Sequence, residues 1–274
     1  MRQPVVRYEV ADRVATITLS RPERLNAWTG RMSLEYRTAL QEASTDSSVR
    51  VVVVTGEGRG FCAGADSDAL AAHAKRGGYD SGLATDAPAP GYGVRVEFDA
   101  DLAYHLGVAK PIIAAVNGPA AGIGFALACW CDLRFAAAGA KLTSAHGRLG
   151  LPAEFGLSYL LPRLVGLTRA ADLLLSSRVF FAEEAAAMGL VNAVLPSEEL
   201  MEHVYGYAHV LAYEVSSASV AATKQQLYAD LVGGNPAASI NASLSLLDSM
   251  MGGRDYREGV AALRERRRPS FPTA

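Results

Sequence analysis

The sequence predicts an α/β protein with a helical C-terminal region. Short β-branched runs, typical of strands, alternate with apolar positions at helical spacing as far as about residue 196. Beyond that point the strand pattern stops and long helical stretches begin. We therefore expect an α/β core over residues 1–196 and a helical C-terminal region over residues 197–274.

Three segments predict strands. Val14–Leu19 alternates apolar and polar residues, as a strand with one buried face does. Residues 51–54 are four consecutive valines, and Ile112–Val116 is a similar run. Continuous runs of this kind are typical of strands covered on both faces.

Helices are expected between and after these strands. Residues 122–130, 168–176 and 182–188 carry apolar side chains at helical spacing. An earlier helix is indicated by five apolar positions on one face: Met32, Tyr36, Ala39, Leu40 and Ala43. Ser197 is expected to cap the first C-terminal helix, since serine accepts hydrogen bonds from a helix N-terminus.

Composition excludes several functional classes. The net charge of −2 and the pI of about 6.2 do not provide the excess of positive charge that is typical of nucleic-acid-binding proteins. The three cysteines, Cys62, Cys129 and Cys131, form no disulfide framework and lack zinc-ligand spacing, so we expect a reducing compartment and no metal site.

One long uncharged stretch resembles a membrane span in length. No charged residue occurs between Lys110 and Asp132. Proline, asparagine and glycine residues interrupt this stretch, which indicates a strand, a turn and a helix inside a core. The N-terminus does not resemble a secretory signal, and we expect a cytoplasmic protein without membrane contact.

Two glycine-bearing turns are the strongest candidates for chemistry. Residues 60–66 follow the valine strand, and residues 116–124 join a buried strand to an apolar helix. Turns of this kind can aim backbone N–H groups at one developing negative oxygen. Taken singly, a turn of this kind more often reflects simple packing, and neither turn matches a phosphate-binding loop or a nucleophile elbow.

Several motifs, in order, resemble signatures of the crotonase (enoyl-CoA hydratase/isomerase) family. The resemblance covers nearly the whole chain, from about residue 14 to about residue 267. The matching segments are residues 21–27, 60–66, 110–118, 161–166, 182–192 and 256–259.

The resemblance implies a spiral of ββα units followed by a helical trimerisation region. It implies that the N–H groups of Ala65 and Ile123 form an oxyanion hole for the thioester carbonyl of an acyl-CoA. Ala63 matches the position whose carbonyl meets the adenine, and Arg24 and Leu25 lie on the segment lining the coenzyme A path. Coenzyme A is then part of the substrate, no separate cofactor is needed, and a homotrimer or a dimer of trimers is expected.

The apolar content of the C-terminal region agrees with an assembly. Apolar residues there exceed what a small appendage needs to cover itself, and exposed apolar patches usually mark interfaces. The positions concerned are Leu244, Leu246, Leu247, Met250 and Met251. The alternative is that they pack only within their own subunit.

The family's usual hydratase acids are missing. Typical hydratases carry glutamate at the positions of Ala126 and His146, where two carboxylates hold one water and deliver its proton. Glu154 lies instead in a segment resembling that of enoyl-CoA and dienoyl-CoA isomerases, where one carboxylate is the acid/base. Its apolar sequence neighbours are expected to raise its pKa by desolvation.

Alternative interpretations stay open for these residues. Glu154 could be an ordinary loop acid or a helix-start carboxylate. His146 could hydrogen-bond Glu154 or substrate, or could be a satisfied wall residue. Trp28, Phe155 and Tyr159 could line an acyl pocket or belong to the core, and residues 77–93 could be a lid or an insertion.

Three functions follow from these alternatives. The first is an enoyl-CoA isomerase in which Glu154 performs a 1,3-proton shift. The second is an enoyl-CoA hydratase with unusual acid/base residues. The third is a catalytically inactive homologue that binds acyl-CoA or RNA, although the low pI disfavours RNA.

Overall fold

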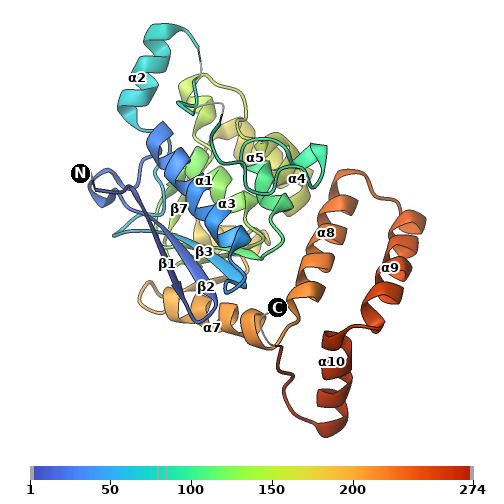
Figure 1. Cartoon of the computed structure of the whole chain (residues 1–274). Helices are drawn as coiled ribbons and strands as arrows, with labels where there is room; N and C mark the ends of the chain where they lie inside the picture. Colours follow the sequence, from blue (N-terminus) through green and yellow to red (C-terminus); the bar gives the residue numbers. More distant parts are fainter. Residues whose placement is uncertain (1–2, 79, 84–85, 272–274) are drawn as a thin grey trace.

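The computed structural model describes residues 3–78, 80–83 and 86–271. It contains an α/β core and a helical arm on one side of it (Figure 1). The main sheet has the order β1-β2-β3-β4-β6-β9, and a smaller sheet has the order β5-β7-β8. The α/β class expected from the sequence is confirmed.

The strands are short, and most of them run parallel. In the main sheet only the β1–β2 pair is antiparallel. The main-sheet strands are β1 (Val6–Ala11), β2 (Val14–Leu19), β3 (Val51–Gly56), β4 (Ile112–Val116), β6 (Leu133–Ala137) and β9 (Ala193–Leu195). The small sheet contains β5 (Ala120–Ala121), β7 (Lys141–Thr143) and β8 (Phe180–Phe181).

Both faces of the central strands are buried, which explains the continuous valine run. Every residue of β3 and β4 is buried. Val52 and Val54 belong to the apolar cluster that includes helix α1 (Gly30–Thr45). Val51 and Val53 point to the opposite face and join the cluster under α7 (Leu200–Tyr213). The three predicted strands are therefore confirmed.

The predicted helices are also present, although the first C-terminal helix begins later than expected. The five apolar positions expected on one face of α1 are all buried. The remaining helices are α2 (Ser67–Arg76), α3 (Ile123–Trp130), α4 (Leu157–Val165), α5 (Leu167–Ser176), α6 (Ala182–Ala187), α8 (Ser217–Gly233), α9 (Pro236–Met251) and α10 (Arg254–Glu265). Short 3-10 turns occur at Pro22–Arg24, Val96–Phe98, Ala103–Gly107 and His146–Leu149.

The expected cap at Ser197 is wrong. Helix α7 begins at Leu200, and Glu199 is its N-cap residue, without a side-chain capping bond. The turn after Pro196 occupies residues 197–199 and is closed by the Pro196 carbonyl, which accepts bonds from the amides of Glu199 and Leu200. The helix therefore begins at Leu200, and not directly after Ser197.

Helices α8, α9 and α10 form an arm that projects from the core (Figure 1). Within the described residues, α9 buries no side chain, and α8 buries only Lys224. Apolar side chains along the arm are about half exposed or more: Leu227, Ile240, Leu244, Leu247, Met251 and Leu263. In this subunit alone, the arm has much uncovered apolar surface.

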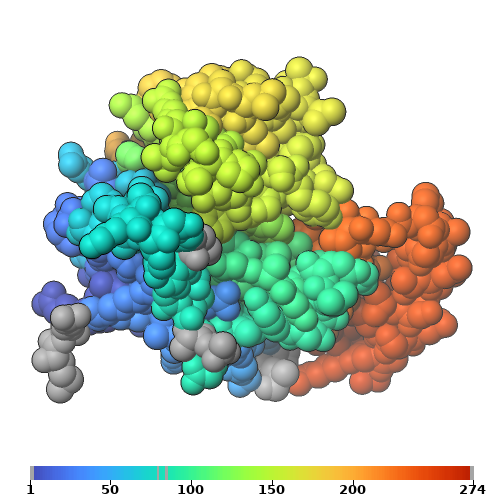
Figure 2. All heavy atoms as spheres, turned by 90° about the horizontal axis from the view of Figure 1, so that it is seen from above, coloured from blue at the N-terminus to red at the C-terminus, as the bar shows by residue number. Residues whose placement is uncertain are grey.

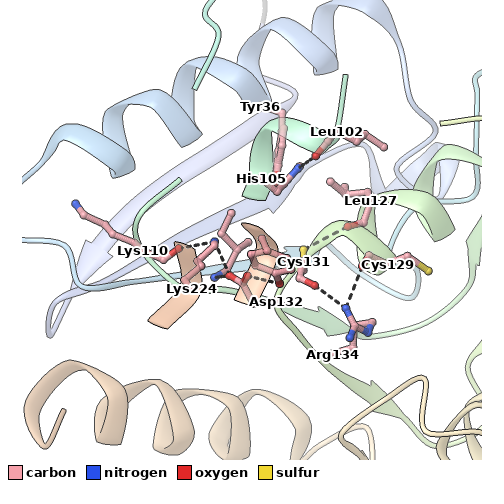
Figure 3. A network of polar contacts seen from close by, with 12 residues as sticks. Tyr36, Leu102, His105, Lys110, Leu127, Cys129, Cys131, Asp132, Arg134 and Lys224 are labelled. Carbon is pink, nitrogen blue, oxygen red and sulfur yellow. Dashed lines mark hydrogen bonds and ion pairs between the residues drawn. The ribbon is translucent and has the colours of Figure 1, made fainter. Parts of the chain in front are cut away.

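A buried ion pair attaches the arm to the core (Figure 3). The Lys224 ammonium donates to the Asp132 carboxylate at 2.7 Å and to the Lys110 carbonyl at 3.0 Å. The Tyr228 hydroxyl and the Ile112 amide donate to the same carboxylate at 2.7 and 2.6 Å. Asp132 lies between α3 and β6, so these bonds fix α8 against the ends of two core elements.

A second buried network holds the 3-10 turn Ala103–Gly107. His105 Nδ1–H donates to the Leu102 carbonyl at 2.5 Å. Burial lowers the pKa of His105 to about 3, so the ring is neutral and Nε2 accepts from the Tyr36 hydroxyl at 2.7 Å. Arg37 pairs with Asp101 at 3.0 Å just before this turn. Helix α1 therefore fixes the segment that follows residues 77–93.

No helix among the described residues is long and apolar enough to cross a membrane. The uncharged stretch after Lys110 is divided between β4, β5 and α3, as its proline and glycine content predicts. The cytoplasmic location stays a prediction.

Candidate active site

The two glycine turns meet in space. The Cys62 amide donates to the Pro119 carbonyl at 3.1 Å, and the Ala121 amide donates to the Cys62 carbonyl at 3.0 Å. A Cβ at Gly124 would lie 2.2 Å from the Cys62 carbonyl oxygen, so only glycine permits this approach. The start of α3 is thereby packed directly against the first turn.

A third segment orients the Ala65 amide. Trp28 N–H donates to the Gly64 carbonyl at 2.7 Å, and Asp66 N–H donates to the Trp28 carbonyl at 2.9 Å. Successive amides of an extended chain point to opposite sides. Since both neighbours of Ala65 bond to Trp28, the Ala65 N–H points away from that segment.

The Ile123 amide is available for a different reason. Ile123 is the first residue of α3, and the amides of a first helical turn lack intrahelical acceptors. Its N-cap, Gly122, has φ of +51° and lies against Gly64: a Cβ on Gly122 would be 3.9 Å from the Gly64 Cα. In the described part of the chain, neither the Ala65 nor the Ile123 amide has a hydrogen-bond partner. Two free donors therefore occupy adjoining turns.

The expected coenzyme-binding residues lie beside these donors. The Ala63 amide donates to the Leu25 carbonyl at 3.0 Å, which brings Ala63, Ala65 and Leu25 into one region. Arg24 is exposed and lies 3.6 Å from the Asp68 carboxylate, so its side chain is at the surface near the same turn.

Asp66 has a structural role here. Its side chain caps α2 by accepting from the Asp68 amide at 3.0 Å, and it pairs with Arg21 at 2.9 Å. Burial acts to raise its pKa, but these hydrogen bonds and the nearby arginines outweigh burial and lower it. The carboxylate is thus kept charged and occupied.

A cavity of about 590 Å³ lies near the end of α3. Its walls come from the segment over residues 97–106, the end of α3, the loop before α4, and α8. The space-filling view shows the yellow-green surface of residues about 145–165 beside the green surface of residues about 95–108, with the arm next to both (Figure 2). The side chains facing the cavity include Glu97, Asp101, Ala103, Trp130, Glu154, Phe155, Tyr159 and Val232.

The three carboxylates of this cavity differ in their partners. Asp101 is paired with Arg37 at 3.0 Å, and Glu97 with Arg95 at 3.4 Å. Glu154 has no lysine or arginine within ion-pair distance in the described ranges. It is the carboxylate least neutralised by a fixed cation.

Burial raises the pKa of Glu154, and the nearby His146 acts in the opposite direction. The sequence neighbours account for part of this burial. Leu151 and Pro152 are exposed, whereas Ala153 and Phe155 are half-buried and Phe155 lines the cavity. Trp130 and Tyr159 add further walls from other elements.

His146 lies close enough to Glu154 to affect its charge, as one of the two alternatives for this residue requires. It is 5% exposed, and its Nδ1 atom has no hydrogen-bond partner within residues 3–78, 80–83 and 86–271. Ala126, the other position where hydratases carry glutamate, is fully buried in α3 and contributes no polar group.

Some site residues were not apparent in the sequence. The segment over residues 97–106 carries no recognisable motif, yet it forms one wall. Trp130 belongs to an apolar helical pattern and is indistinguishable from core there. Phe155 and Tyr159 do line the cavity, whereas Trp28 packs on Tyr36 in the core with ring centroids 5.7 Å apart.

Residues 77–93, which the sequence leaves as either a lid or an insertion, lie apart from the walls of this cavity where the structure describes them. Of this segment, residues 79 and 84–85 lie outside the described residues. None of its described residues lines the 590 Å³ cavity. The adjoining segment that does so is fixed by Arg37 and His105, as described above.

The three cysteines take no part in this site. All three are buried and free. Burial raises the pKa of the Cys62 and Cys129 thiols to about 12, so both are protonated at neutral pH. No group of three or more potential metal ligands occurs in the part of the chain that the structure describes.

Comparison with known proteins agrees with the geometry. The sequence profile of the enoyl-CoA hydratase/isomerase family matches residues 9–273. A probable enoyl-CoA hydratase, EchA12, of Mycobacterium tuberculosis strain H37Rv is 38% identical over 264 residues, covering 94% of this chain and 89% of that protein. The 1,2-epoxyphenylacetyl-CoA isomerase of Escherichia coli K12 is 35% identical over 267 residues, covering 94% of each.

Solved structures show the same fold. A probable enoyl-CoA hydratase/isomerase from Mycobacterium abscessus superposes with a TM-score of 0.85 at 30% identity, covering 98% of this chain and 99% of that one. An enoyl-CoA hydratase from Bacillus anthracis gives a TM-score of 0.84 at 27% identity, covering 98% and 100%. The chain belongs to the enoyl-CoA hydratase/isomerase family of enzymes, the crotonases.

Proposed function

We propose that this enzyme is an enoyl-CoA isomerase that moves a carbon–carbon double bond by a 1,3-proton shift, with Glu154 as the acid/base. The observation that carries the proposal is the state of Glu154. It is half-buried in a largely apolar cavity, has a raised pKa and lacks a fixed cationic partner in the described ranges. A carboxylate whose pKa is raised is better suited to both accept and return a proton.

The proposed reaction begins with the thioester carbonyl bound by the Ala65 and Ile123 amides. Glu154 takes a proton from the α-carbon of a 3-enoyl-CoA, and the electron pair delocalises into a dienolate whose oxygen is stabilised by the two amides. Glu154 then returns the proton to the γ-carbon. The double bond moves into conjugation with the thioester, and the product has the same atoms as the substrate.

The coenzyme part of the substrate is proposed to follow the segment that holds the first turn. Leu25 and Ala63 are joined by a backbone hydrogen bond beside Ala65. Arg24 is exposed next to them, where a cation can meet a phosphate. Coenzyme A enters as part of the substrate, and the proposed steps use no separate cofactor.

Hydration is the second candidate, and a specific observation favours it. Two relatives that we compared are named as hydratases, and His146 lies near Glu154 at a position where hydratases carry an acid. A histidine and a glutamate could together hold a water and transfer its proton. Against this, Ala126 leaves the other hydratase position without any polar group.

Product masses distinguish these reactions. We would incubate the protein separately with 3-enoyl-CoA and 2-enoyl-CoA thioesters of several chain lengths. Isomerisation is expected to give an unchanged mass, a shifted retention time and the absorbance of a conjugated thioester. A gain of one water from 2-enoyl-CoA, without isomerisation of 3-enoyl-CoA, would establish hydration instead. If the protein binds these thioesters but converts none of them, it is an inactive acyl-CoA-binding homologue.

We also propose that the protein assembles as a homotrimer or a dimer of trimers. The arm carries apolar side chains that its own subunit leaves exposed, among them Leu244 and Leu247 on α9. Exposed apolar surface of this kind is normally covered by a partner. Light scattering at micromolar concentration is expected to give three or six subunits, and Leu244→Glu with Leu247→Glu should shift the mass downwards. A stable monomer of the parent protein would contradict the proposal.

A further inference from the structure

The loop that carries Glu154 has a strained backbone. Phe155 has φ of +51° and Gly156 has φ of +70°, so two consecutive residues are left-handed immediately after the carboxylate. Phenylalanine rarely adopts this conformation, because its Cβ crowds the backbone. Such a strained conformation persists only where contacts with the surrounding structure hold it in place.

Trp130 supplies those contacts. The indole Nε1–H donates to the Phe155 carbonyl at 2.7 Å. A Cβ at Gly156 would lie 2.8 Å from Cζ2 of the same indole, so the ring rests against the backbone of the loop. Trp130 is the last residue of α3 and is 5% exposed, which leaves it little room to move.

The contacts of Trp130 connect the two halves of the site. Helix α3 begins at Ile123, one of the two amide donors, and ends at Trp130. The indole lines the same cavity as Glu154. One rigid helix therefore presents an oxyanion donor at its first residue and holds the acid/base loop at its last.

We infer that Trp130 is a positioning residue that fixes the Glu154 loop in its working conformation. This inference rests on the proposed acid/base role of Glu154. A single carboxylate that serves two carbon atoms needs a fixed backbone, since displacement by about 1 Å can lower a rate by about 10²-fold. Without the indole N–H, the Phe155 carbonyl loses its partner and the left-handed turn loses a restraint.

The first test is Trp130→Phe, which keeps an aromatic ring and removes the donor. We expect kcat for 3-enoyl-CoA isomerisation to fall by about 10- to 10²-fold. KM should change by less than about threefold, because the amide donors and the coenzyme path are untouched.

The pH profile provides a second measurement. Relaxation of the loop should admit water to Glu154 and lower its pKa, because burial is what raises it. The acid limb of kcat/KM is therefore expected to move to lower pH in Trp130→Phe. General loss of stability would not produce that movement.

The matched control is Tyr228→Phe. It also removes one aromatic donor, from a hydrogen bond of 2.7 Å that joins α8 to Asp132 and not to the Glu154 loop. It should retain the kcat and the acid limb of the parent. If Tyr228→Phe reproduces both changes, the effect of Trp130→Phe is general and the inference is wrong.

A second variant reaches the same contact from the loop. Gly156→Ala places a Cβ against the indole at a left-handed position, so it should also lower kcat and move the acid limb. This variant decides the question if Trp130→Phe does not fold. A folded Gly156→Ala protein with the parent's kcat and pH profile would overturn the inference.

Glu154→Gln separates this inference from the proposed function. An inactive Glu154→Gln together with a fully active Trp130→Phe would leave the proposed function in place and refute the role of Trp130. A fully active Glu154→Gln would refute the proposed function itself, and the positioning role with it.

Discussion

Replacing Ile123 by proline is expected to lower kcat for a 3-enoyl-CoA by about 10²–10³-fold, the usual effect of removing one oxyanion donor. Ile123 is the first residue of α3, where proline is well tolerated because that amide has no intrahelical partner. The substitution thus removes the donor while the helix keeps its hydrogen bonds. Steady-state kinetics on the purified protein would measure the effect, with circular dichroism to confirm the fold.

Ile123→Ala is the matched control for this substitution. Ile123 is 5% exposed, so proline also changes core packing. Alanine removes more side-chain volume than proline does and keeps the N–H group, so it is a stringent test of the packing change. We expect Ile123→Ala to lose stability and retain most of its turnover number. If a folded Ile123→Pro protein is as active as Ile123→Ala, the Ile123 amide is not a donor of the proposed oxyanion hole.

Glu154→Gln is expected to lower isomerisation by about 10²-fold or more, within the range for a positioned acid/base, while affinity for the CoA thioester persists. Glutamine keeps the shape of the side chain and cannot accept the α-proton. In the parent, kcat/KM should fall as the pH drops through the pKa of Glu154. Because burial raises that pKa, the acid limb should lie above the ordinary glutamate value of 4.5.

The same substitution should not destabilise the protein at neutral pH. Since the folded-state pKa of Glu154 is raised, the unfolded chain loses this proton first as the pH increases. The carboxyl therefore lowers stability as the pH rises from the unfolded pKa through the folded pKa. Glutamine lacks this penalty, so the Tm of Glu154→Gln at pH 7 should equal or exceed that of the parent.

Glu97→Gln is the control for the loss of a carboxylate from the same cavity. Glu97 is exposed and paired with Arg95, so its removal should have a far smaller effect than Glu154→Gln. If Glu154→Gln isomerises as fast as the parent, the shuttle assignment is wrong. His146→Gln would then be the next variant to measure.

The sequence predicted the elements whose patterns are local. Four consecutive valines are explained by a strand with apolar clusters on both faces, and the turn at residues 116–124 follows from its glycines. Ser197 was misassigned because a capping residue signals a helix start only in the absence of a competing turn. Here the Pro196 carbonyl closes such a turn and moves the start to Leu200.

The sequence offered Phe155 and Tyr159 as cavity walls, but the other walls could not be predicted, because they depend on contacts between distant segments. Asp101 and Ala103 carry no motif, and their placement depends on Arg37 of α1 and on the His105 hydrogen bonds. Trp130 satisfies an apolar helical pattern, and its hydrogen bond to the Phe155 carbonyl appears only once α3 and the loop are adjacent. The burial of Glu154 is partly tertiary, since Trp130 and Tyr159 line its cavity together with its sequence neighbour Phe155.

The assembly of the oxyanion turns has a consequence for folding. The bridges Trp28–Ala65 and Cys62–Ala120 join three segments that are far apart along the chain, and each closes a long loop. Loop-closure entropy must be lost before such contacts return any stabilisation, so they form late and slow the folding of a domain. A nascent or refolding chain can thus form a local element such as α1 while still lacking any catalytic geometry. Recovered activity would therefore report completion of the whole core.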